Sequence, residues 1–145
     1  MLLNIPPSFT PDFLKYMMAM GHGEELLLSD GNYPVLSAGD PSKPRIYLPV
    51  ADIASLLEDV LRFFPLDYTV DAPLTVMESA LESGAHAQYQ EVIGKMKLEV
   101  SIATMERFEF YRRASSAAVI AVTASTVKGG NILIKKGVVR SIEKK

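Results

Sequence analysis

The chain has 145 residues, enough for one domain with a substantial hydrophobic core, and we expect residues 1–145 to form that single domain. Its 48% hydrophobic and 22% charged residues are ordinary for a globular protein, while the absence of cysteine excludes disulfides, thiolate nucleophiles and cysteine-bound metals. The net charge of −2 gives no electrostatic reason to expect a nucleic acid or a membrane surface as a partner.

The first elements along the chain are a predicted helix and a short strand. Residues 10–12, Thr-Pro-Asp, combine an N-cap, a first-turn proline and an acidic residue, and Gly21 is a natural helix end. Residues 25–29, Glu-Leu-Leu-Leu-Ser, then predict a buried strand. His22 would precede this strand, and Asp30 would lie at its carboxyl end.

The middle of the chain alternates loops, strands and helices. Residues 31–43, rich in Gly, Pro, Ser and Asp, predict a loop, and residues 45–48 predict a short strand. Residues 51–64 are the clearest helix, because their apolar side chains recur at i, i+3, i+4, i+7 and i+8. A strand over residues 74–77 and a more polar helix over residues 85–96 follow.

The last third of the chain continues the alternation. Residues 98–102 alternate apolar with polar or small side chains and predict a half-exposed strand, and residues 107–116 predict a short helix. Residues 117–123 predict a strand buried on both faces, and residues 131–135 a last strand. Helices that alternate with short apolar strands predict a single-domain α/β sandwich about a largely parallel sheet.

His22 is the first candidate functional residue. It lies between two glycines, which leave the imidazole unshielded by neighbouring side chains, and an imidazole can donate or accept a proton near neutral pH. Asp30 follows eight residues later, at the strand end where ligands of open α/β sheets bind. Each residue also has a structural alternative, a helix cap for His22 and a turn residue for Asp30.

Three separated motifs lie in register along the chain. They are Met20–Gly23 (Met-Gly-His-Gly) with Asp30–Pro34 (Asp-Gly-Asn-Tyr-Pro), Glu106–Ala114 (Glu-Arg-Phe-Glu-Phe-Tyr-Arg-Arg-Ala) and Gly130–Gly137 (Gly-Asn-Ile-Leu-Ile-Lys-Lys-Gly). In order and separation they resemble the fucose mutarotase and ribose pyranase family over nearly the full length. The Arg-Phe-Glu-Phe-Tyr block and the Lys-Lys-Gly ending are similar to the fucose-type branch.

The resemblance implies a cofactor-free monosaccharide site built where the subunits of a ring-like homo-oligomer meet. It matches His22 to the general acid of the family, and Asp30, Arg107 and Asn131 to sugar-binding positions. The family usually carries a tyrosine two residues before the matched asparagine, where this chain has Gly129. No metal site is expected, because the two histidines lie far apart in sequence and no third ligand is indicated.

The expected function is therefore the interconversion of the α and β anomers of L-fucose or a related sugar. Ring opening delivers a proton to the ring oxygen and removes one from the anomeric hydroxyl, which positioned acid–base groups can do without a metal or a redox centre. Carboxylate, guanidinium and amide groups are suited to neighbouring sugar hydroxyls. The chain has no apolar stretch of about 20 residues and no signal-type N-terminus, so we expect a cytoplasmic protein.

Other functions remain open from the sequence. A non-catalytic sugar-binding or transport-associated module of the same fold is motivated by Gly129, and a structural assembly protein would form rings without a ligand. A nucleotide-binding protein would need a phosphate loop, which does not follow residues 128–130. Arg107 next to Glu106 also fits an exposed ion pair, and Asn131 also fits a turn residue.

Overall fold

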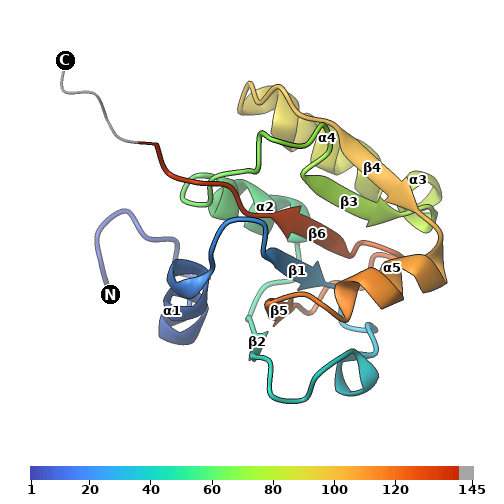
Figure 1. Cartoon of the computed structure of the whole chain (residues 1–145), viewed down its shortest axis with the longest axis horizontal. Helices are drawn as coiled ribbons and strands as arrows, with labels where there is room; N and C mark the ends of the chain where they lie inside the picture. Colours follow the sequence, from blue (N-terminus) through green and yellow to red (C-terminus); the bar gives the residue numbers. More distant parts are fainter. Residues whose placement is uncertain (141–145) are drawn as a thin grey trace.

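In the computed structural model, which describes residues 1–140, six strands form one sheet in the order β2-β5-β1-β6-β3-β4 (Figure 1). The strands are β1 (Glu25–Ser29), β2 (Arg45–Tyr47), β3 (Leu74–Met77), β4 (Ile102–Met105), β5 (Val119–Val122) and β6 (Ile132–Lys135). Neighbouring strands are parallel except at β6, which is antiparallel to both β1 and β3. The mostly parallel α/β sheet predicted from the sequence is confirmed.

The direction of the strands gives the sheet two distinct ends. Five strands finish at one end, which we call the carboxyl end, and β6 begins there. At the opposite end, the amino end, the five strands begin and β6 finishes. Segments far apart in the sequence therefore meet at each end of the sheet.

Helices cover both faces of the sheet. They are α1 (Pro11–Ala19), α2 (Ile53–Leu61), α3 (Ser79–Ser83), α4 (Ala85–Lys95), α5 (Arg107–Ala114) and the 3₁₀ turn η1 (Val35–Ser37). On one face α1, α2 and α4 pack against Leu26 and Leu28, and on the other face α5 packs near Leu27 (Figure 1). This alternation along β1 follows from the period of two in a strand.

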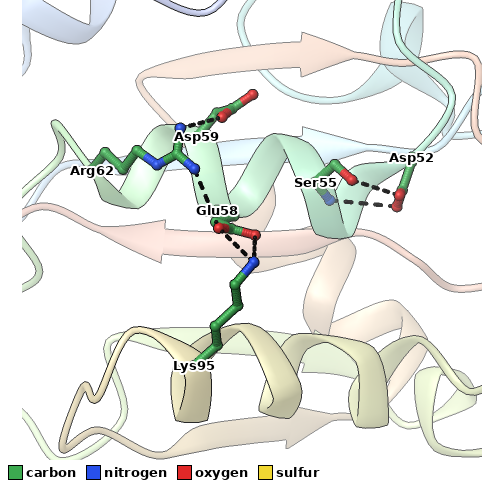
Figure 2. Close-up of polar contacts among 6 residues, drawn as sticks. All are labelled: Asp52, Ser55, Glu58, Asp59, Arg62 and Lys95. Carbon is green, nitrogen blue, oxygen red and sulfur yellow. Dashed lines mark hydrogen bonds and ion pairs between the residues drawn. The ribbon is translucent and has the colours of Figure 1, made fainter. Parts of the chain in front are cut away.

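Polar contacts on the surface link α2 to α4 (Figure 2). Glu58 accepts a hydrogen bond from Arg62, the C-cap of α2, and forms an ion pair at 3.0 Å with Lys95 on α4. Both cations are more than half exposed, so these pairs contribute little to stability. The apolar face of α2 that its spacing predicts is buried in the core.

Three parts of the chain differ from the sequence-based prediction. The strand predicted over residues 98–102 begins only at Ile102, because Leu98 and Val100 pack against the core from a loop rather than from a sheet ladder. The short helix α3 and the turn η1 were not predicted. Within residues 1–140, no helix combines the length and apolarity needed to cross a bilayer.

Candidate functional site

The carboxyl end of the sheet brings Asp30 and Asn131 together. The backbone N–H of Asp30 donates to Asn131 Oδ1 at 2.8 Å, and Asn131 Nδ2 donates to Asp30 Oδ2 at 3.2 Å. The register of β1 and β6 explains this, because it places Leu28 opposite Ile132 and so the end of β1 beside the start of β6. Asp30 and Asn131 are 101 residues apart in the sequence, and the sheet brings them within hydrogen-bond distance.

The Asp30 carboxylate combines burial with several hydrogen bonds. The residue is only 5% exposed, and burial raises the pKa of its carboxyl group, while hydrogen bonds from Asn32 and Asn131 act in the opposite direction. Its Oδ1 accepts from the backbone N–H of Asn32 at 2.9 Å, the local contact expected of a turn residue. The turn role and the pairing with Asn131 therefore coexist, and the oxygens keep lone pairs for further donors.

The segment before Asn131 is fixed by contacts with two helices. Gly129 has a φ of +66°, and a Cβ there would overlap the side chain of Ser79. Gly130 follows, and its carbonyl accepts a hydrogen bond from the buried hydroxyl of Tyr89 on α4. Both the backbone conformation and the close approach favour glycine at position 129, so this loop offers no side chain to the site there.

We expect Tyr89→Phe to lower the free energy of unfolding by about 1–3 kcal/mol, because it leaves the buried Gly130 carbonyl without its donor. Urea denaturation at neutral pH measures the change. Tyr68→Phe is the matched control, since Tyr68 is 60% exposed, and its effect should stay within about 0.5 kcal/mol. Equal effects of the two substitutions would contradict the role of Tyr89.

Arg107 begins α5 at the carboxyl end of the sheet. Its guanidinium lies over the rings of Phe108, at 4.7 Å, and Tyr111, at 5.8 Å, and it makes no ion pair within residues 1–140. Glu106 caps the helix instead, and the backbone N–H groups that it accepts lower the pKa of its carboxyl group. The alternative of an Arg107–Glu106 ion pair is therefore not observed.

Aromatic contacts connect this helix to the loop after Asp30. The ring of Tyr111 meets that of Tyr33 edge to face, with centroids 5.5 Å apart, and Tyr33 lies three residues after Asp30. The structure thus gathers Asp30, Asn131 and Arg107 at one end of the sheet. These are carboxylate, amide and guanidinium groups, a set suited to binding hydroxyls.

His22 lies at the opposite, amino end of the sheet. It is beyond Met20, the C-cap of α1, and its imidazole is 48% exposed. Its Nε2 lies 3.2 Å from Oδ1 of Asp67, a carboxylate that no sequence pattern indicated, because it is 45 residues away. The observed partner of His22 is thus Asp67 in the loop between α2 and β3, and not the helix terminus.

Asp67 is held as an ionised acceptor. Hydrogen bonds from Thr69, from its hydroxyl at 2.6 Å and its backbone N–H at 3.0 Å, lower the pKa of Asp67 to about 2, with a smaller effect from His22. An ionised carboxylate only accepts hydrogen bonds, so Nε2 of His22 carries the proton in this contact. The other ring nitrogen, Nδ1, is left for proton exchange.

The lowered pKa of Asp67 predicts a pH-dependent stability. Its folded pKa is below the ordinary value of 3.8, so its contribution is present above about pH 4 and is lost as the pH falls towards 2. Asp67→Asn should remove this part of the acid dependence. Urea midpoints measured between pH 2.5 and 5 should therefore fall less steeply for the variant, and identical slopes would contradict the assignment.

Asp30 contributes to the pH dependence of stability with the opposite sign. The pKa of Asp30 is raised in the folded protein. Its contribution to the stability of the fold is therefore present below the ordinary pKa of 3.8 and is lost as the pH rises through the folded pKa. The comparison of Asp67→Asn with the unmodified protein cancels this effect, because Asp30 is unchanged in both.

The two groups of candidate residues lie at opposite ends of β1. His22 precedes β1 and Asp30 follows it, and a strand of five residues spans about 16 Å. One sugar ring is too small to contact both side chains across that length. Among residues 1–140, no three histidine, aspartate or glutamate side chains gather in a way that would hold a metal ion.

Comparison with known proteins supports the resemblance inferred from the sequence motifs. The crystal structure of the fucose mutarotase in complex with L-fucose from Streptococcus pneumoniae has a TM-score of 0.82 and 33% identity, over 96% of this chain and 100% of that chain. The fucose mutarotase of Mus musculus is 35% identical over 143 residues, 94% of each chain. The L-fucose mutarotase of Histophilus somni (strain 2336) is 37% identical over 143 residues, 95% of this chain and 97% of its own.

A match to a family profile extends over almost the whole chain. Residues 3–139 match the profile described as the RbsD / FucU transport protein family. The curated relatives and the fold agree with that match. The chain therefore belongs to the RbsD / FucU family.

Proposed function

We propose that this protein is a cofactor-independent mutarotase that interconverts the α and β anomers of L-fucose or a closely related sugar. The observation that carries the proposal is its likeness, over 96% of the chain, to a fucose mutarotase whose structure contains L-fucose. The curated relatives named as fucose mutarotases, at 35–37% identity, support the same activity.

His22 is the proposed proton-transfer group. Opening of the cyclic hemiacetal needs a proton at the ring oxygen and the loss of one from the anomeric hydroxyl, and closure on the other carbonyl face reverses both transfers. A half-exposed imidazole, fixed through Nε2 by the ionised Asp67, can exchange a proton through Nδ1. Asp67 thereby orients the imidazole ring.

Asp30, Asn131 and Arg107 are the proposed sugar-binding groups. The buried carboxylate can accept bonds from sugar hydroxyls, the guanidinium can donate to adjacent oxygens, and the amide can do both. The Asp30–Asn131 hydrogen bonds fix these two groups before the sugar arrives. The lack of an ion pair within the described residues leaves the Arg107 fork available for the ligand.

The separation of His22 from Asp30 leads us to place the complete site between two subunits of a ring-like homo-oligomer in the cytoplasm. One subunit would contribute His22 and its neighbour Asp30, Arg107 and Asn131. Exposed apolar side chains offer surface for subunit contact, including Met18 and a groove of about 630 Å³ between α1 and the N-terminal segment.

The direct test is NMR exchange spectroscopy on the anomeric protons of L-fucose, with and without the protein. We expect the protein to accelerate exchange between the two anomers, and D-ribose and D-glucose measured in parallel define its preference. The competing function is a binding module without catalysis, which the lack of a side chain at Gly129 favours. Calorimetric fucose binding with no faster exchange than in buffer would contradict the mutarotase and support the module.

A further inference from the structure

Lys136, the residue directly after β6, holds the segment that carries His22. The backbone N–H of Gly23 donates to the carbonyl of Lys136 at 2.8 Å, and the N–H of Lys136 donates to the carbonyl of Glu24 at 2.9 Å. The chain immediately after His22 is therefore tied to residue 136 in both directions. These bonds use only backbone groups and do not depend on which side chain stands at position 136.

Residues 135–137, the end of β6 and the two residues after it, also hold the segment that carries Asp67. The N–H of Asp67 donates to the carbonyl of Lys135 at 3.1 Å, and the N–H of Gly137 donates to the carbonyl of Pro65 at 2.8 Å. An antiparallel bridge joins Leu66 to Lys136 between these two bonds. Residues 135–137 thus lie between the two segments, and we call them the β6 brace.

Gly137 allows the closest contact in this arrangement. A Cβ at position 137 would overlap the carbonyl oxygen of Leu66 and would lie 2.7 Å from its carbonyl carbon and 3.0 Å from Cα of Asp67. These are backbone atoms, which cannot rotate away as a side chain can. A methyl group at position 137 must therefore increase the distance between residue 137 and residues 66–67.

We propose that Gly137 is a positioning residue for His22, because it lets the β6 brace hold Asp67 within hydrogen-bond distance of the imidazole. The bond from Nε2 is 3.2 Å long, so a displacement of several tenths of an ångström breaks it. His22 is tied to the brace through Gly23 and Glu24 and would not follow Asp67. The catalytic consequence rests on the proposed function, in which His22 exchanges the proton of the sugar.

The test substitution is Gly137→Ala, with Gly94→Ala as its matched control. Gly94 lies in α4, and a Cβ there meets no atom within 4 Å. We expect Gly137→Ala to lower kcat for anomer exchange by about 10- to 100-fold with little change in KM, because misplacement by about 1 Å has effects of this size. Gly94→Ala should leave kcat unchanged.

A double-variant comparison separates positioning from general damage. If Gly137 acts through Asp67, Gly137→Ala should cause no further loss of kcat in a protein that already carries Asp67→Asn. Independent, multiplied losses would overturn the proposal. Gly94→Ala should stabilise the protein, because alanine favours a helix more than glycine does. Gly137→Ala is therefore also made in the Gly94→Ala protein. If that double variant does not fold, Gly137 is required by the fold as a whole, which would overturn the specific positioning role.

A spectroscopic readout makes the inference independent of activity. The ¹⁵N chemical shifts of the neutral His22 ring report its tautomer, with His86 as the second histidine in the spectrum. We expect the Nε2–H tautomer in the sugar-free protein and a mixture in both Gly137→Ala and Asp67→Asn. An unchanged tautomer in Gly137→Ala would overturn the positioning role, whereas absent anomer exchange in the unmodified protein would overturn only the proposed function.

Discussion

Replacement of His22 by alanine is expected to lower the rate of catalysed anomer exchange by about 10²- to 10⁴-fold, the usual contribution of one general acid–base group. The reason is that the half-exposed imidazole, held by Asp67, is the proposed carrier of the sugar proton. Exchange spectroscopy at saturating L-fucose measures the loss. Sugar binding by calorimetry should change much less, because Asp30, Arg107 and Asn131 are unaltered.

The chain contains a natural control for this substitution. His86 is the only other histidine, and it lies at the start of α4 without a hydrogen bond to another side chain among residues 1–140. His86→Ala should leave the exchange rate unchanged. An active His22→Ala protein would show that a different group moves the proton.

Replacement of Asp30 by asparagine is expected to weaken sugar binding by about 1.5–3 kcal/mol, which corresponds to roughly 10- to 150-fold in affinity. The substitution keeps the shape of the side chain and an acceptor for the N–H of Asn32, but it removes the charge and places an amide against Asn131. Because burial raises the pKa of the Asp30 carboxyl group, the charged form is less favourable in the fold than in water, and removing the charge costs the fold little. We therefore expect affinity to fall more than stability.

Asp40→Asn provides the matched control for Asp30→Asn. Asp40 accepts from the backbone N–H of Ser42 at 2.8 Å, the same local turn contact that Asp30 makes with Asn32. It is exposed and belongs to no candidate site. Calorimetric titration with L-fucose should give an unchanged affinity for Asp40→Asn, and equal losses in the two variants would contradict a specific role for Asp30.

The fold was predicted where a local signal was strong. Thr10 caps α1 as expected, and the apolar spacing of residues 51–64 located α2 and its buried face. Apolar alternation failed over residues 98–102, because a loop that covers the core can show the same pattern as a strand. Period alone does not distinguish these two environments.

The candidate site was predicted in part. Position at the carboxyl end of a strand indicated Asp30, and the family resemblance indicated Arg107 and Asn131, which the sheet brings to the same end. Asp67 could not be predicted, since its relation to His22 arises only when β6 lies between their segments. The sequence around Asp67 and His22 shows no pattern for this contact, because residues 135–137, far along the chain, bring the two segments together.

Gly129 shows how structure changes the interpretation of a single position. From the sequence it was only the absence of the tyrosine usual in the family. In the structure it has a left-handed conformation and lies against Ser79, so the loop itself is adapted to glycine. Asp30 and Asn131 are hydrogen-bonded to each other although position 129 has no side chain.

The central claim is that one sugar site takes His22 from one subunit and Asp30 from its neighbour, because β1 separates these residues by about 16 Å. The most direct measurement mixes two impaired variants, His22→Ala and Asp30→Ala, by co-expression with different affinity tags, at an L-fucose concentration too low to saturate Asp30→Ala. Random assembly should restore roughly a quarter of the sites, and with them anomer exchange of L-fucose. Mixed oligomers that are no more active than each variant alone would contradict the shared site.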